Sequence, residues 1–112
     1  MTIPVAVCAA LALVAAAGAA AQQPARPTDA GATLFGQRCA GCHAETGWAT
    51  RVLARRVPAG EAPLAARRGL AAETVQAVVR SGIGMMPAIR KAELGDRDLA
   101  AIADYLARGD GK

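Results

Sequence analysis

Two cysteines and the only histidine of the chain stand together in the string from Cys39 to His43, which reads Cys-Ala-Gly-Cys-His. Thiols and an imidazole at this spacing suit covalent haem attachment, a redox-active dithiol, a structural zinc site or a plain disulfide. In haem attachment, the cysteines form thioether bonds on one side of the porphyrin and the following histidine binds the iron. The two residues between the cysteines let a single helical turn present both sulfurs to the ring, and the small size of Ala40 and Gly41 allows the backbone to lie close to it.

The other interpretations lack the context that they need. A thioredoxin-type dithiol sits in a strand-helix-strand unit, which the hydrophobic pattern does not indicate. A structural zinc site takes four nitrogen or sulfur ligands, whereas Cys39, Cys42 and His43 are the only such residues after the N-terminal apolar run. An interaction module held by a Cys39–Cys42 disulfide stays open. We predict one covalent haem c, with thioether bonds from both cysteines and His43 as proximal iron ligand.

The elements around this string are predicted to be helical. A helix is expected from about Ala30 up to the cysteines, with Thr28 or Asp29 as its N-cap. Glycines and prolines interrupt residues 45–69, which leaves room for only a short helical piece over residues 52–57.

The second half of the chain has a clearer periodicity. Valines at i, i+3 and i+4 predict a helix over residues 72–81, which Gly82 ends. A loop over residues 82–93 follows. After Gly95, acidic residues in a first turn and an apolar stripe predict a last helix that ends at Gly109. No alternating pattern of a strand is present, so we predict an all-α fold.

With these helices around the string, the chain resembles the class I c-type cytochromes, small mono-haem proteins. It is similar to the cytochrome subunits of periplasmic dehydrogenases. Gly31, Phe35 and the Cys39–His43 string match the first helix of that family. The resemblance implies a cytochrome c fold, with three to four short helices wrapped around the haem. It also implies that Phe35 packs against the last helix, where Tyr105 and Leu106 are the expected partners.

The distal iron ligand also follows from the resemblance. The family carries a glycine-containing loop that ends in Met-Pro, which matches Met86 and Pro87. Met86 is therefore the expected distal ligand, with Met85 as the alternative. The residue before a proline avoids the α region, so Met86 should be extended. A His/Met pair fills both axial positions, and the soft thioether raises the reduction potential.

The chain departs from the family pattern on the proximal side. Many relatives have a proline about eight residues after the histidine, near a carbonyl that accepts the imidazole N–H. Arg51 stands there in this chain. Another carbonyl is expected to orient His43, because iron-binding imidazoles need such a partner. Trp48 is expected to pack near the haem edge, with a partly exposed loop position as the alternative.

Composition and charge suit a small carrier. The chain has 112 residues, a net charge of +4, and only one Phe, one Trp and one Tyr. So few aromatic side chains make a thin core, which a large flat cofactor would complete. Arginines gather in the middle segment, at Arg51, Arg55, Arg56, Arg67 and Arg68. One or two of them are expected to pair with haem propionates, and the others to face solvent or steer an acidic partner.

The chain opens with an uncharged apolar run that ends in alanines at Ala21. This predicts a signal peptide over residues 1–21, cleaved after Ala21, with a periplasmic product. An uncleaved membrane anchor is the alternative, because the run approaches the ~20 residues that span a bilayer. Cys8 lies within this segment and is interpreted as a discarded apolar residue. A flexible leader over residues 22–28 and a cytochrome domain over residues 29–112 are expected to follow.

The resemblance implies a one-electron carrier and not an enzyme. The expected donor is a periplasmic dehydrogenase, and the acceptor an oxidase or another cytochrome of a respiratory chain. A dedicated subunit of a dehydrogenase complex is also consistent with the sequence. A haem enzyme or gas-binding sensor is the alternative, which requires an open distal site without Met86. Export and the lack of interleaved aromatic residues argue against a nucleic-acid partner, and membrane contact is expected only with an uncleaved signal.

Overall fold

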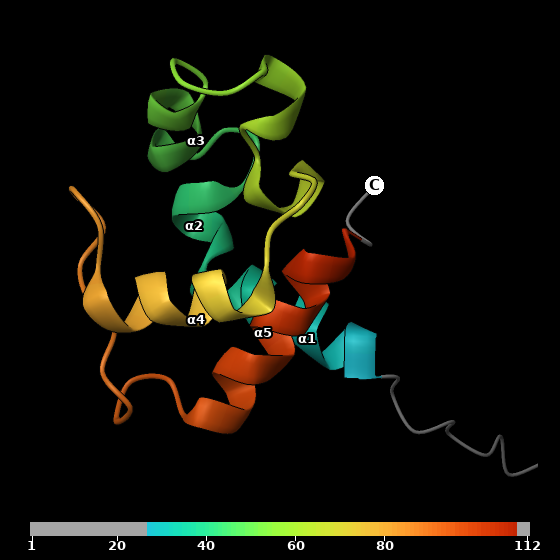
Figure 1. The fold of residues 1–112 in the computed structure, drawn as a ribbon, viewed down its shortest axis with the longest axis vertical. Helices are drawn as coiled ribbons and strands as arrows, with labels where there is room; N and C mark the ends of the chain where they lie inside the picture. Colours follow the sequence, from blue (N-terminus) through green and yellow to red (C-terminus); the bar gives the residue numbers. More distant parts are fainter. Residues whose placement is uncertain (1–26, 110–112) are drawn as a thin grey trace, which may run out of the picture.

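The computed structural model describes residues 27–109, and this part of the chain is all-α with no strand (Figure 1). The all-α prediction is confirmed. The elements in chain order are α1 (Pro27–Arg38), α2 (Ala40–His43), α3 (Trp48–Leu53), the 3-10 turns η1 (Ala59–Glu61) and η2 (Leu64–Ala66), α4 (Ala72–Ser81) and α5 (Asp96–Arg108). The signal peptide expected over residues 1–21 lies outside the described residues.

The last two long helices have the bounds that their periodicity predicts. Helix α4 ends at Gly82, whose φ is +72°, and α5 ends at Gly109, whose φ is +65°. Glycine adopts such positive φ angles without the steric cost that a Cβ would bring. Both stop signals are therefore local backbone effects, which explains why the sequence predicts them well.

The first helix differs from its prediction at its start. Helix α1 begins at Pro27, so Thr28 and Asp29 lie inside it, and their prediction as N-caps is wrong. Proline suits the first helical position because its φ is already helical and its missing N–H would have no partner there. The leader expected over residues 22–28 lies outside the described residues, except for Pro27 and Thr28, which open α1.

The short helix expected over residues 52–57 lies earlier, as α3, which begins at Trp48. A side-chain hydrogen bond holds this helix against the segment just before it. The Thr50 hydroxyl donates a 2.7 Å hydrogen bond to the carbonyl of Ala44, and Thr50 is buried. Helical periodicity carries no record of such a bond, so the pattern alone misplaced the helix.

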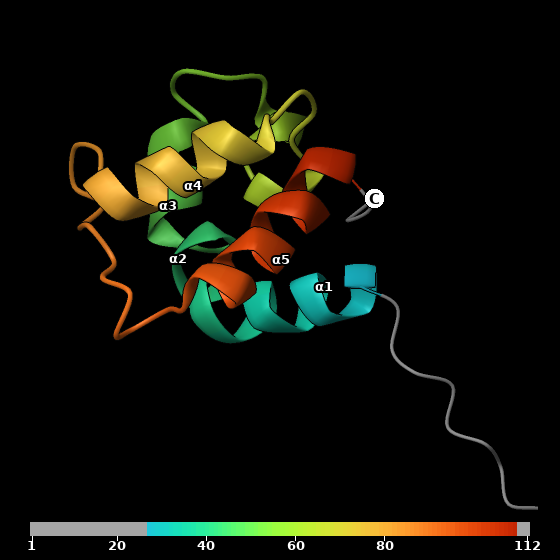
Figure 2. The ribbon, with the colours of Figure 1, turned by 60° about the horizontal axis from the view of Figure 1, so that its bottom comes forward.

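Helix α5 forms the centre of the hydrophobic core. Figure 2 shows it between α1 and α4, and it packs against both. The close approach of α1 depends on Gly31, because a Cβ there would collide with the carbonyl of Ala101 and with Tyr105. The core side chains come from α1, α4, α5 and the loop before α5, and are Phe35, Val75, Val79, Leu94, Leu99, Ile102, Ala103 and Leu106.

The predicted pairing of Phe35 with the last helix is confirmed. Its ring centroid lies 5.8 Å from that of Tyr105, with 48° between the ring planes, and Phe35 is only 6% exposed. Leu106 belongs to the same buried cluster. Because α1 leads directly into Cys39, this contact also fixes the direction from which the cysteine string enters the fold.

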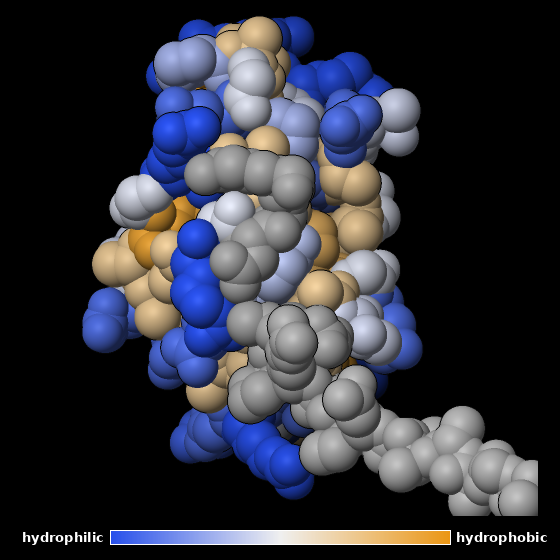
Figure 3. Space-filling model, turned by 90° about the vertical axis from the view of Figure 1, so that its right-hand side faces the viewer, coloured by the Kyte–Doolittle hydropathy of each residue, from blue (hydrophilic) through white to orange (hydrophobic). Residues whose placement is uncertain are grey.

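On the face shown in Figure 3, hydrophilic side chains surround smaller apolar areas. Within residues 27–109, no helix combines the length and the apolar character that crossing a membrane requires.

Candidate functional site

A cavity of about 240 Å³ opens between the cysteine string and helices α4 and α5. Its wall is mainly aliphatic, with valines from α4 and the apolar face of α5. Cys39 and His43 contribute from the string, and Met86 contributes from the loop after α4. A second hollow of about 280 Å³ shares His43 and Met86 with the first. The sequence-predicted residues from two distant parts of the chain therefore meet at one apolar space.

Helix α2 is the single turn that presents the two thiols. The backbone N–H groups of Cys42 and His43 both bond to the carbonyl of Cys39, at 3.1 and 3.0 Å. Both cysteines are half-buried free thiols. Burial raises the pKa of the Cys39 thiol, and the neighbouring Cys42 raises it further. Cys39 is therefore held in its neutral form beside the apolar wall.

His43 lines both hollows and is half-buried. Burial lowers its pKa, so the imidazole is kept neutral, which is the form that binds a metal. Its Nδ1 atom is buried and has no hydrogen-bond partner. The carbonyl predicted to orient this ring is therefore not found among residues 27–109.

The two neighbouring methionines have different surroundings. Met86 is half-buried, lines both hollows and packs against the core. Of the two hollows, Met85 borders only the second, and it is 78% exposed. Burial and direction therefore favour Met86 as the thioether that faces the cavity.

A tight turn holds Met86 in this position. Ile83 and Met86 exchange two backbone hydrogen bonds of 3.0 and 2.9 Å, and Gly84 between them has a φ of +56°. Gly82 packs closely against this turn: a Cβ there would lie 2.8 Å from the Met86 carbonyl oxygen, so no larger residue fits. Gly84 is required for its positive φ angle. Gly82 is required for its positive φ angle and also for the close approach to the Met86 carbonyl.

Trp48 lies directly beside the cysteine string. Its indole N–H donates a 3.2 Å hydrogen bond to the sulfur of Cys42, and its ring lines the second hollow with His43. The turn that brings it there passes so close to the carbonyl of Cys42 that Gly47 has no room for a Cβ. Trp48 thus stands at the edge of the candidate site.

The donor set fits a covalently attached haem: two thiols one turn apart, an imidazole and a thioether around an apolar space. Residues 26–106 match the family model described as cytochrome C oxidase, cbb3-type, subunit III. The chain belongs to this family. Comparison with curated proteins and with solved structures gave no match.

Membership makes the chain a c-type cytochrome with covalently attached haem c. It belongs to a family of electron carriers and not of enzymes, which act with redox protein partners. Domains of this type are typically exported. The prediction of haem c from the five-residue string is confirmed, and so is the electron-carrier role that the family resemblance implies.

The arginines of the middle segment have different surroundings in this cytochrome. Arg67 lines the first cavity and Arg56 lines the second hollow. Arg51 instead donates a 2.7 Å hydrogen bond to the carbonyl of Thr46. Of these three arginines, Arg56 and Arg67 therefore lie at the candidate site.

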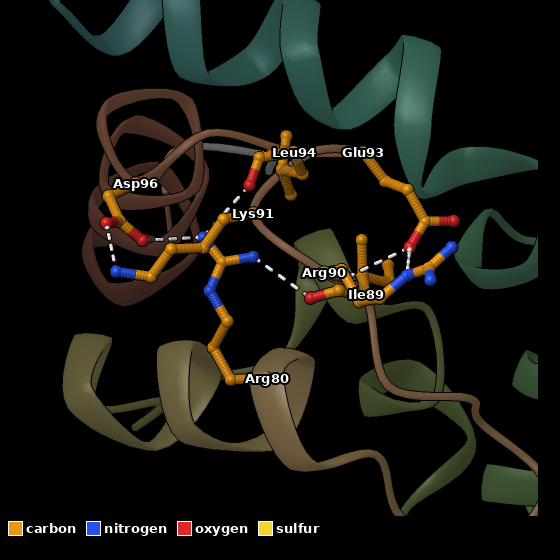
Figure 4. A network of polar contacts seen from close by, with 7 residues as sticks. All are labelled: Arg80, Ile89, Arg90, Lys91, Glu93, Leu94 and Asp96. Carbon is orange, nitrogen blue, oxygen red and sulfur yellow. Dashed lines mark hydrogen bonds and ion pairs between the residues drawn. The ribbon is translucent and has the colours of Figure 1, made fainter.

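Sequence reasoning missed Arg80, which Figure 4 shows at the centre of a polar network. Its guanidinium donates to the carbonyls of Ile89 and Leu94 at 3.0 and 2.9 Å, and to Asp96 at 2.8 Å. From the sequence, Arg80 looks like an ordinary basic residue in the last turn of a helix, where the helix dipole favours a positive charge. Its position at one end of the methionine loop, with an acidic residue at the other end, was the available signal.

Proposed function

We propose that this cytochrome is a one-electron carrier of the periplasm, with its haem held by Cys39, Cys42, His43 and Met86. The cysteines would form the two thioether bonds, His43 the proximal axial bond and Met86 the distal one. The single observation that carries this proposal is the shared apolar cavity, which His43 and Met86 both line from segments far apart in sequence. When bound, the haem iron takes up and releases one electron.

The residues around the cavity supply the conditions for that exchange. The aliphatic wall excludes water, and a low local dielectric tunes the potential of a metal site. His43 is kept neutral by burial and so offers a free electron pair. A thioether stabilises Fe(II) and raises the potential. With His43 and Met86 both binding the iron, the protein would leave no open site for a substrate or a gas.

Arg67 is the proposed partner of a haem propionate. Among residues 27–109, it is, with His43, the only ionisable nitrogen side chain on the wall of the first cavity. A guanidinium pairs with a carboxylate through two parallel hydrogen bonds. Arg56, on the wall of the second hollow, is the next candidate.

The proposed contact surface for redox partners lies beside the second hollow. Trp48, Val52, Ile83 and Met85 are large apolar side chains that are exposed there. Arg56 gives this edge a positive charge, which would attract an acidic partner and speed its association. Small apolar contacts of this kind suit the transient complexes of electron-transfer proteins.

The proposed donor is a periplasmic dehydrogenase, and the proposed acceptor is an oxidase or another cytochrome. The description of the matched family names an oxidase subunit, which supports an oxidase as acceptor. Reduction of the purified cytochrome by membranes or by a candidate dehydrogenase, followed by its reoxidation by an oxidase, would test this order. A cytochrome that the dehydrogenase supplied with its substrate does not reduce, or that the oxidase does not reoxidise, would contradict it.

Residues 1–21 are proposed as a cleaved signal peptide, with residues 22–28 as leader and residues 29–112 as the cytochrome domain. The support is the uncharged apolar run that ends at Ala21. N-terminal sequencing of the exported protein should find Gln22 first. An intact Met1 would instead favour a membrane anchor.

A visible spectrum of the ferric holoprotein tests the closed site. Methionine bound to ferric haem adds a weak band at the red end, which we expect to see. The reduced protein should also resist carbon monoxide. A missing band together with rapid carbon monoxide binding would replace the carrier by a haem enzyme or gas sensor.

A further inference from the structure

Arg80 joins three parts of the fold with one side chain. It stands in the last turn of α4 and reaches the loop before α5 and the first residue of α5 (Figure 4). Its Nη1 atom donates to the Ile89 carbonyl, and its Nη2 atom donates to the Leu94 carbonyl and to Asp96. The side chain is 23% exposed, so these bonds are partly shielded from water. Hydrogen bonds from a charged donor are among the stronger ones in proteins.

The loop that carries Met86 is tied to α4 at both of its sides. On the near side, Met86 bonds to Ile83, next to the helix end. On the far side, the Ile89 N–H bonds to the carbonyl of Val79 at 2.8 Å while its own carbonyl accepts from Arg80. Met86 therefore lies between two anchors, and Arg80 supplies part of the second.

The neighbouring charges do not replace this link. Lys91 bonds to Asp96 at 2.8 Å but is 75% exposed, and it reaches only α5. Arg90 and Glu93 pair within their own exposed turn. Exposed ion pairs of these two kinds contribute little to stability. Among these contacts of the loop, only those of Arg80 connect α4, the loop and α5 at once.

We propose that Arg80 is a positioning residue for the distal iron ligand. By holding residues 89–96 against α4, it keeps the loop from moving away from the cavity and so keeps the Met86 thioether over it. This inference rests on the proposed role of Met86 as ligand. The hydrogen bonds of Arg80 go to Ile89, Leu94 and Asp96, and none of these is a proposed iron ligand.

The test is the displacement of methionine by added imidazole in the ferric holoprotein, followed by the loss of the methionine band. Arg80→Gln should lower the imidazole concentration at half displacement by about tenfold, the equivalent of one lost charged hydrogen bond. Arg80→Lys keeps the positive charge but not the two terminal nitrogens of the guanidinium, so its imidazole midpoint should lie between those of Arg80→Gln and the unchanged protein. Arg90→Gln is the matched control, an arginine of the same loop without the link, and should leave the midpoint unchanged.

A merely structural role of Arg80 would lower the melting temperature and leave the imidazole midpoint, measured well below melting, as in the unchanged protein. That result overturns the inference. If Arg80→Gln does not fold, Arg80→Lys decides in the same way, with a smaller expected shift. Absence of the methionine band from the unchanged protein would instead overturn Met86 as ligand, so the two failures are distinguishable.

Discussion

The string that carries His43 and the loop that carries Met86 reach the same cavity by different routes. The string is held by short-range contacts: its turn closes on Cys39, Trp48 donates to Cys42, and Thr50 donates to Ala44. The loop has one local turn, between Ile83 and Met86, but its far side depends on contacts between elements, since Arg80 bonds to Leu94 and Asp96. A locally held segment forms with its own helix, whereas a segment held across elements loosens when any one of them shifts. We therefore expect mutations of supporting residues, which do not themselves bind the haem, to disturb the distal side more readily than the proximal side.

The largest effect is expected on the proximal side, where attachment is covalent. Replacing Cys39 and Cys42 together by alanine should abolish thioether bonds, because no sulfur then faces the vinyl groups. Mass spectrometry of the denatured exported protein measures this as the loss of the haem-sized mass addition. Cys8→Ala is the matched control and should keep that addition. An addition that survives in the double variant would disprove the attachment string.

The next effect concerns the distal ligand. Met86→Ala should remove the methionine band and lower the reduction potential by at least ~60 mV, which is tenfold in a one-electron equilibrium. Redox titration with optical detection measures both. Met85→Ala, a truncation at the exposed neighbour, should change neither. The opposite pattern would move the ligand to Met85.

A core truncation should affect both regions together. Phe35→Ala is expected to lower the free energy of unfolding of the holoprotein by about 3–5 kcal/mol, because the ring is buried against α5. Denaturant unfolding measures this loss. Gln37→Ala, at an exposed site of the same helix, is the control and should stay within ~0.5 kcal/mol of the parent. A negligible loss at Phe35 would mean that the contact of α1 with α5 is not a major support.

The smallest effect is a pH dependence of the loop network. Hydrogen bonds from Lys91 and then from Arg80 lower the pKa of Asp96 below its ordinary value of 3.8. The stabilisation is therefore present above that ordinary value and is lost as the pH falls through the lower pKa of the folded state. Unfolding free energies measured from pH 6 down to about pH 2 should fall slightly more steeply in the unchanged protein than in Asp96→Asn. Parallel curves would show that Asp96 contributes nothing to the loop.

Much of the candidate site was predictable because its information is local. The spacing of Cys39, Cys42 and His43 lies within one helical turn, and a turn has the same geometry wherever it occurs. The bounds of α4 and α5 follow from side-chain periodicity and from glycines at their ends. The Met-Pro pair also predicts an extended residue, since proline restricts the one before it.

Only the tertiary structure decided the features that join separate segments. It brought Met86 to the cavity and left Met85 exposed, began α3 at Trp48, and connected Arg80 across the loop. It also left His43 Nδ1 without the acceptor that the sequence predicts. The sequence by itself determined the attachment chemistry and the helices, because those depend on neighbours along the chain. The distal geometry depends on which helices meet, and spacing within one segment carries no information about that.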